Sequence, residues 1–134
     1  MEDRPSQPVR IVLTASLSPS EDPSKVLAAA KNVFGECPTH VEQSQYAVKL
    51  TSEQIDCLQK LHDQLRDRRV RGAARRLLLR SMEEKKLSLL INRQAAFVGI
   101  LSLCSAEKES PLGPIFLEIH SDAPEKLVDW LASY

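Results

Sequence analysis

The stretch that decides the fold is Ile115–His120, IFLEIH, near the end of a chain of 134 residues. Apolar residues recur along it at every second position, at Ile115, Leu117 and Ile119. Side chains that alternate in this way line one face of a β-strand. The stretch therefore predicts a strand with one apolar face, and it leaves Glu118 and His120 together on a solvated face.

Four other segments predict strands, and helices are predicted between them. The strands are residues 9–18 (VRIVLTASLS), a part of residues 40–50 (HVEQSQYAVKL), residues 87–91 (LSLLI) and residues 95–103 (AAFVGILSL). The first predicted helix is residues 24–34, with Ser20 as its N-terminal cap and Gly35 after its end. A second helix is opened by a capping box at residues 51–54, and the arginine-rich segment forms a third helix after a break near Asp67. A closing helix is opened by a second capping box at residues 122–125. We expect Tyr46, Val48 and Leu50 to share one face of the second strand. The order β-α-β-α-α-β-β-β-α predicts an α+β fold in which helices cover a largely antiparallel sheet.

Length and composition predict a single domain over residues 9–134, after a loose N-terminal segment at residues 1–8. The net charge is zero, and no apolar run approaches the roughly 18 residues that span a bilayer. Cys37, Cys57 and Cys104 are scattered and form no CxxC pair, which is typical of buried or idle thiols in a reducing cytosol. We therefore expect a cytoplasmic protein without a signal segment, a membrane span or a cofactor.

The charged residues are segregated along the chain. Residues 66–80, RDRRVRGAARRLLLR, contain seven arginines. Residues 66–86 hold nine basic and three acidic residues, whereas the other 113 residues hold nine basic and fifteen acidic ones. A neutral chain thus carries one strongly cationic element, which is the electrostatic pattern of a surface that meets phosphate.

A helical wheel of this segment predicts a buried stripe with a charged frame. The stripe that would face the core consists of Val70, Ala73, Ala74, Leu77 and Leu78. Gly72 and Leu79 fall on the outer ridge, and arginines fall on both flanks. Because the guanidinium group binds phosphate through a planar fork of donors, these arginines are the candidate phosphate contacts. They are Arg68, Arg69, Arg71, Arg75, Arg76 and Arg80.

A structural role for the same arginines is the main alternative. Arginine favours helices, and its stem covers apolar surface while its head stays in water. The acidic residues elsewhere would then pair with these side chains, either inside the fold or across a homodimer. Clustered, unpaired arginines on an open face would favour nucleic acid, whereas paired arginines or an exposed apolar patch would favour a protein partner.

Other segments carry weaker signals. Asn92, Arg93 and Gln94 interrupt two predicted strands, and they are secondary candidates for direct contact with a ligand; a polar hairpin connection is the alternative. Residues 110–114, SPLGP, predict a rigid turn. The sequence has no nucleotide-binding glycine motif, no zinc-ligand spacing and no catalytic histidine pattern. We therefore expect neither an enzyme nor a metal site.

Four motifs follow one another between residues 74 and 131, and the resemblance they belong to runs from about Val9 to Leu131, nearly the whole chain. They are ARRLLLR at residues 74–80, INRQAAFVGILSL at 91–103, SPLGPI at 110–115 and VDWL at 128–131. In this order and spacing, the chain resembles a family of small archaeal proteins described as predicted RNA-binding proteins. The resemblance implies an α+β fold like that of a large-subunit ribosomal protein that binds ribosomal RNA.

The resemblance also bears on partners and on one residue. In some relatives the domain is fused behind a P-loop kinase domain, whose motif is absent here. Relatives usually carry aspartate where this chain has Gly72, so the loss of that carboxylate makes the arginine segment more positive. We therefore hypothesise a non-enzymatic RNA-binding domain of an archaeal cytosol. The alternatives are a protein-interaction or dimerisation module, for example with a P-loop kinase, and an enzyme that holds a small phosphorylated substrate with the arginines and residues 92–94.

Overall fold

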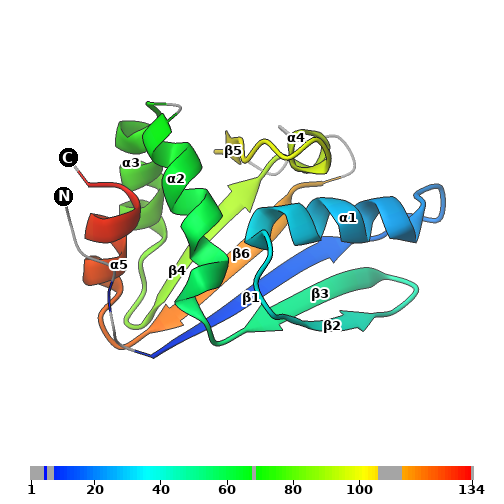
Figure 1. Ribbon diagram of the computed structural model, residues 1–134, viewed down its shortest axis with the longest axis horizontal. Coiled ribbons are helices and arrows are strands. Elements are labelled where there is room, and N and C mark those ends of the chain that lie inside the picture. The colour runs from blue at the N-terminus through cyan, green and yellow to red at the C-terminus, as the bar shows by residue number, and fades with distance from the viewer. Residues whose placement is uncertain (1–4, 6–7, 68, 106–112, 134) are drawn as a thin grey trace.

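A computed structural model describes residue 5, residues 8–67, residues 69–105 and residues 113–133. The strands are β1 (Val9–Ser16), β2 (His40–Gln43), β3 (Ala47–Ser52), β4 (Lys86–Ile91), β5 (Leu103–Cys104) and β6 (Ile115–Ser121). The helices are α1 (Pro23–Phe34), α2 (Gln59–Asp67), α3 (Arg71–Ser81), α4 (Arg93–Phe97) and α5 (Pro124–Leu131), with a 3₁₀ turn, η1 (Ile55–Leu58), before α2. Within the described residues the strands form one antiparallel sheet in the order β2-β3-β1-β6-β4-β5. The helices gather on one side of it (Figure 1), which confirms the predicted α+β fold.

The centre of the sheet is built by β1 and β6, which come from opposite ends of the chain. Leu13 lies opposite Leu117, and Ile11 lies opposite Ile119. These four side chains are buried and face the helices, as the alternation in residues 115–120 predicted. The residues between them point to the other face of the sheet, which none of the described helices covers (Figure 1), and Phe116 there is 37% exposed.

Helix α1 covers the predicted residues, is capped two residues later than predicted, and packs on the sheet through small residues. Its cap is Asp22, whose Oδ1 accepts a hydrogen bond from the backbone N–H of Ser24 at 3.0 Å, and not Ser20. Ala29 and Ala30 are buried, and their small side chains let the helix approach the sheet closely. The predicted end is confirmed, because Gly35 caps the helix with φ 71°, a conformation that favours glycine.

Residues 40–50 form a hairpin and not a single strand. The hydroxyl of Ser44 accepts hydrogen bonds from the backbone N–H groups of Tyr46 and Ala47, which turns the chain between β2 and β3. Val48 and Leu50 are buried on one face of β3, but Tyr46 lies in the turn and is 71% exposed. Its predicted place on the same strand face as Val48 and Leu50 is therefore wrong.

Both predicted capping boxes are wrong for one shared reason. In each case the strand runs further than predicted and ends in a buried serine, Ser52 in β3 and Ser121 in β6. Each hydroxyl accepts a hydrogen bond from the backbone N–H two residues later, at Gln54 and at Ala123. The serines therefore close the turns that follow the strands, and α5 begins with Pro124 without a side-chain cap.

The predicted strand at residues 95–103 is mostly helix and loop. Asn92 caps α4, with its Oδ1 accepting from the N–H of Ala95 at 2.9 Å, and only Leu103 and Cys104 join the sheet. Two amide side chains hold the connecting loop. Asn32 Nδ2 donates to the carbonyl groups of residues 96 and 97, while Gln64 donates to the carbonyl of residue 99 and accepts from the N–H of residue 101. The predicted strand is wrong because these tertiary contacts, and not the apolar pattern of residues 95–103, determine the conformation of the segment.

A disulfide joins Cys37 to Cys57, with their Cα atoms 5.4 Å apart. The prediction of idle thiols is wrong for this pair, whereas Cys104 is a buried free cysteine. The hairpin formed by β2 and β3 explains the pairing, because it leads the chain away after α1 and returns it to η1 beside Cys37. The bond closes a loop with a sequence separation of 20.

Candidate nucleic-acid interface

The arginine-rich helix begins with a sharp reversal of the chain. Helix α2 ends at Asp67, which confirms the predicted break, and Arg69 has φ 56° in the left-handed region. This conformation is unusual for a residue with a side chain, and it turns the chain from α2 into α3. Arg69 is exposed at the start of α3, next to the first turn of that helix.

Helix α3 buries a narrow stripe and leaves a broad outer face. Ala74 and Leu78, one turn apart, are fully buried, and Leu77 is half-buried. Ala73 is exposed, so its predicted place in the core stripe is wrong, because α3 packs at the edge of the sheet beside β4 and meets it along a thin line. Leu79 is 46% exposed, as predicted for the outer ridge.

Four arginines from this region line one surface hollow of about 560 Å³, which we call the α3 hollow. They are Arg69, Arg71, Arg75 and Arg76, and they are joined by Gly72, Leu79 and Ser133. A Cβ atom at Gly72 would lie 3.8 Å from Nη1 of Arg76. The absence of a side chain at this position therefore keeps the guanidinium of Arg76 accessible from the hollow.

Arg75 has a structural role that the other arginines lack. Its Nη2 lies 2.9 Å from Oδ1 of Asp129, and its Nη1 donates to the carbonyl of Ala132 at 3.2 Å. It thereby joins α3 to the end of α5, and only 16% of its side chain is exposed. Arg75 therefore has the structural role that was the alternative for these arginines, and we remove it from the candidate phosphate contacts.

The other described candidate arginines of this region have no acidic partner among the side chains that the structure describes. Apart from Asp67, whose side chain is outside that description, no carboxylate of the described residues lies at ion-pair distance from Arg69, Arg71, Arg76 or Arg80. Arg71 makes one contact with a neutral group, the hydroxyl of Ser133 at 3.4 Å. Arg68 lies outside the described residues. We call Arg69, Arg71, Arg76 and Arg80 the arginine surface.

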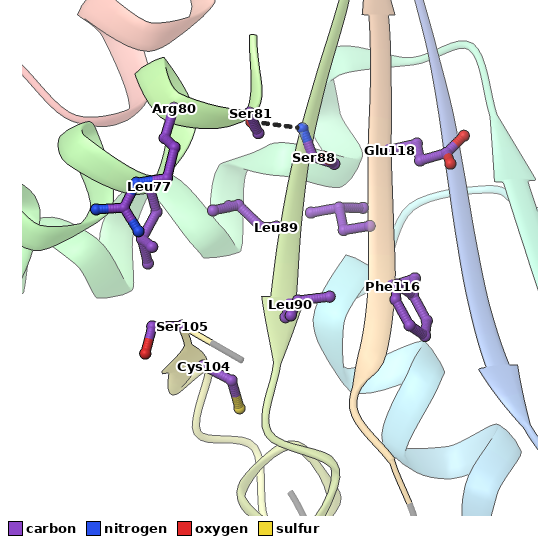
Figure 2. Close-up of a pocket in the computed structure, with 11 residues that line it drawn as sticks. Leu77, Arg80, Ser81, Ser88, Leu89, Leu90, Cys104, Ser105, Phe116 and Glu118 are labelled. Atoms are coloured by element: carbon purple, nitrogen blue, oxygen red, sulfur yellow. Dashed lines mark hydrogen bonds between the residues drawn. The ribbon is translucent and has the colours of Figure 1, made fainter. Parts of the chain in front are cut away.

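Arg80 lies at a second hollow, about 320 Å³ in volume, which we call the β4 hollow. This hollow is lined by residues of α3, β4 and β6 and by Cys104 and Ser105, as Figure 2 shows. Phe116 lines it from β6. Phe116 was not among the candidate residues, although its position between the buried Ile115 and Leu117 puts its ring on the open face of the sheet.

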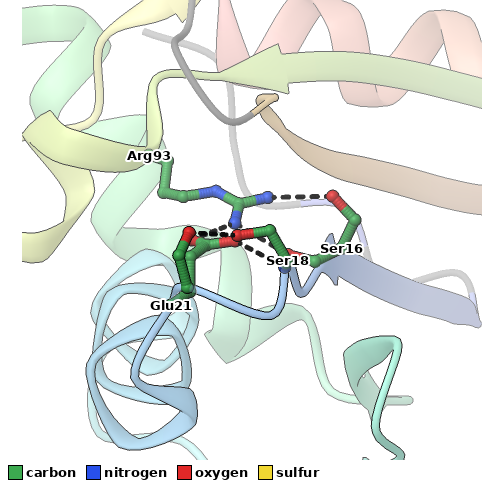
Figure 3. A network of polar contacts seen from close by, with 5 residues as sticks. Ser16, Ser18, Glu21 and Arg93 are labelled. Carbon is green, nitrogen blue, oxygen red and sulfur yellow. Dashed lines mark hydrogen bonds and ion pairs between the residues drawn. The ribbon is translucent and has the colours of Figure 1, made fainter.

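The secondary candidates at residues 92–94 do not join these hollows. Asn92 caps α4, and Gln94 is exposed beside α1. Arg93 is buried beside Glu21 and Ser16 (Figure 3). Its Nη1 lies 2.7 Å from Oε2 of Glu21 and 2.7 Å from the carbonyl oxygen of Ser16. We therefore remove Arg93 from the candidates for direct contact, because its guanidinium is used inside the fold.

The carboxylate that pairs with Arg93 is held in its charged form. Burial by itself would raise the pKa of Glu21. Hydrogen bonds from the backbone of Ser18 and from Arg93, together with the positive charge of Arg93, outweigh burial and hold the pKa of Glu21 below its ordinary value. The pair thus behaves as a buried ion pair that joins β1 and the start of α1 to α4.

Comparison with known proteins places the chain among archaeal relatives. A family model described as RNA binding matches residues 10–121. A UPF0201 protein from Metallosphaera sedula is 41% identical over 124 residues, which cover 92% of this chain and 87% of that protein. The chain belongs to the UPF0201 family. A UPF0201 protein from Sulfurisphaera tokodaii is 40% identical over 91% of this chain and 86% of its own length, so membership of an archaeal family is confirmed.

Solved structures of UPF0201 proteins have the same fold. One covers 93% of this chain and 94% of its own, with a TM-score of 0.78 and 23% identity. The UPF0201 protein from Methanococcus jannaschii covers 93% of both chains, with a TM-score of 0.76 and 24% identity. Among the described residues of the present chain, every helix falls short of the length and apolar character that a membrane span requires.

Proposed function

We propose that this UPF0201 chain is a non-enzymatic RNA-binding protein that contacts phosphates through the arginine surface. The observation that carries the proposal is a set of four arginines that have no carboxylate partner among the side chains that the structure describes, on a chain whose net charge is zero. Guanidinium groups in this state bind phosphate through charge and through paired N–H donors. The description of the matching family model as RNA binding supports the same partner.

A variant that neutralises the arginine surface tests the proposal. We expect the Arg69→Gln/Arg71→Gln/Arg76→Gln/Arg80→Gln protein to bind RNA more weakly, with a flatter dependence on salt. Each lost phosphate contact reduces the slope of log affinity against log salt concentration by roughly 0.7–0.9. The measurement is fluorescence anisotropy with labelled structured and single-stranded RNA at several salt concentrations. Arg75 is left intact so that α5 keeps its anchor.

The matched control removes the same number of charges elsewhere. Lys25, Lys31, Lys85 and Lys126 are exposed and lie outside both hollows. The Lys25→Gln/Lys31→Gln/Lys85→Gln/Lys126→Gln protein has the same net charge as the arginine variant, so it should keep most of the salt slope. Equal losses in the two variants would show that general attraction, and not the arginine surface, binds RNA. Absence of binding by the wild type at low salt would refute the proposed function.

The glycine in the α3 hollow gives a second test. We expect Gly72→Asp to weaken RNA binding several-fold, because a carboxylate one helical turn from Arg76 would pair with its guanidinium. The same substitution should slightly stabilise the fold, since an acidic residue in the first turn of a helix adds about 0.3–1 kcal/mol. Gly72→Asn, with nearly the same shape and no charge, is the control in the same titrations. An equal effect of both substitutions would mean that size at this position matters and charge does not.

A second candidate function is protein interaction, which one observation favours. Three apolar side chains are exposed at the end of α4 and in the loop that follows it: Phe97 (42%), Val98 (73%) and Ile100 (43%). Contiguous exposed apolar side chains often mark the contact area of a partner. A chain that uses this patch in place of the arginine surface would show no RNA binding in the titrations above.

A further inference from the structure

The β4 hollow owes its shape to an incomplete sheet edge. Among the described residues, β5 pairs with β4 only at Leu90 and Ile91, so the rest of this edge of β4 faces α3. There the hydroxyl of Ser81 accepts the N–H of Ser88 at 3.0 Å (Figure 2). The hollow is therefore bounded by α3 on one side and by the short β5 on another.

The lining of the hollow changes character from one side to the other. Leu77, Leu89 and Leu90 supply an apolar surface in its middle. Arg80 lies on the α3 side of β4, and Phe116 lies on the opposite side, on β6 (Figure 2). In the sheet register Phe116 is directly opposite Leu90, and its ring is 37% exposed.

These three kinds of surface match the three parts of a nucleotide. An exposed aromatic ring stacks on a base, an apolar floor accepts the flat body of the base and sugar, and a guanidinium binds the phosphate. The volume of about 320 Å³ lies in the range of small-ligand sites. Glu118, on the same face as Phe116, repels a phosphate, so the phosphate belongs at the Arg80 side.

We propose that the β4 hollow binds one unpaired nucleotide of an RNA strand, with the base on Phe116 and the phosphate at Arg80. This inference rests on the proposed RNA-binding function and specifies its substrate class. Bases inside a duplex are already stacked and paired, so only single strands, loops and bulges present a base that enters the hollow. The site therefore selects unpaired RNA over duplex RNA.

The α3 hollow and the β4 hollow are both lined by arginines of helix α3. Arg76 lines the first and Arg80 lines the second, and they lie one helical turn apart. Neighbouring phosphates of one strand are able to contact both arginines while a single base occupies the β4 hollow. The arginine surface then supplies affinity for any RNA, and Phe116 supplies the preference for an unpaired base.

The decisive variant is Phe116→Ala, compared with Phe97→Ala. Both rings are exposed to a similar degree, at 37% and 42%, but only Phe116 lines the β4 hollow. Fluorescence anisotropy is measured with a labelled mixed-sequence single-stranded RNA and with the duplex of the same sequence. We expect Phe116→Ala to lower the affinity for the single strand about tenfold and to leave the duplex affinity and the salt slope unchanged. Phe97→Ala should change neither, and circular dichroism checks that both variants fold.

A second readout locates the base directly. The same single strand carrying 5-iodouridine is irradiated with the wild-type protein, and the cross-linked peptide is identified by mass spectrometry. We expect the peptide that contains Phe116. Two results would overturn the inference: unchanged single-strand affinity in Phe116→Ala, or an equal loss for the duplex. Either would leave the proposed function intact if the arginine variant still loses binding, whereas a wild type that binds no RNA would remove both proposals.

Discussion

Replacing Arg93 by methionine is expected to lower the free energy of unfolding by about 3–5 kcal/mol, because the change leaves a buried carboxylate without its partner. The side chains of Arg93 and Glu21 are only 6% and 8% exposed, so water does not replace the lost contact. The substitution also leaves the carbonyl of Ser16 without the donor that it has at 2.7 Å. Urea denaturation followed by circular dichroism measures the difference from the wild type.

Two comparisons separate the ion pair from a general loss of arginine. Arg80→Met removes an exposed arginine and should change stability by less than about 0.5 kcal/mol. The double substitution Arg93→Met/Glu21→Met removes both charges, so it should be less destabilising than Arg93→Met alone. If Arg93→Met unfolds at the same urea concentration as the wild type, the buried pair does not hold β1, α1 and α4 together.

The same pair sets part of the acid sensitivity of the fold. Because the pKa of Glu21 is lower in the folded protein than its ordinary value of 4.5, its contribution is complete above that pH and is lost as the pH falls through the folded pKa. In Arg93→Met the burial of Glu21 is no longer offset by the guanidinium, so the pKa of Glu21 in the folded protein rises toward its value in the unfolded chain or above it. The part of the acid-induced loss of stability that Glu21 contributes should therefore be smaller in the variant than in the wild type, and urea titrations at several pH values would detect the difference.

Reduction of the disulfide is expected to lower the melting temperature by about 10 °C. A bridge that closes a loop of this length reduces the entropy of the unfolded chain and stabilises the fold by about 3 kcal/mol. For a domain of this size, each kcal/mol corresponds to a few degrees in melting temperature. Differential scanning calorimetry with and without dithiothreitol measures the shift.

The control for the reductant is the Cys37→Ser/Cys57→Ser protein, whose melting temperature should be low and unchanged by dithiothreitol. A count of thiols supplies an independent check. The unfolded, unreduced wild type should react with one equivalent of thiol reagent, at Cys104, and the reduced protein with three. Three reactive thiols without reductant would contradict the bridge.

The strands at the centre of the sheet were predictable because their signal is local. In residues 115–120 and at the start of the chain, every second residue is apolar, and burial on one face of the sheet is the direct result. The break before α3 was predictable for a similar reason, since the hydrophobic pattern changes near Asp67. The ends of the strands were less predictable. Thr51 and Asp122 resemble helix caps in sequence, whereas in the structure the strands run on to Ser52 and Ser121.

Features that join distant segments left no local signal. Arg93 pairs with Glu21 across 72 residues, and a charged residue between apolar stretches is read more naturally as part of a surface turn. The pairing of Cys37 with Cys57 depends on the path of the hairpin between them. In the candidate site, the charge of the arginine-rich helix was evident from the sequence, but the use of Arg75 inside the fold was not.

The loop after α4 is shaped by residues that do not belong to it. Asn32 holds the end of α4 from α1, and Gln64 holds the loop from α2, while Val98 and Ile100 of the loop are exposed. The path of the backbone therefore depends on the two amides and not on the exposed side chains of the loop. Replacing Val98 or Ile100 should change the surface of the loop and leave its backbone in place.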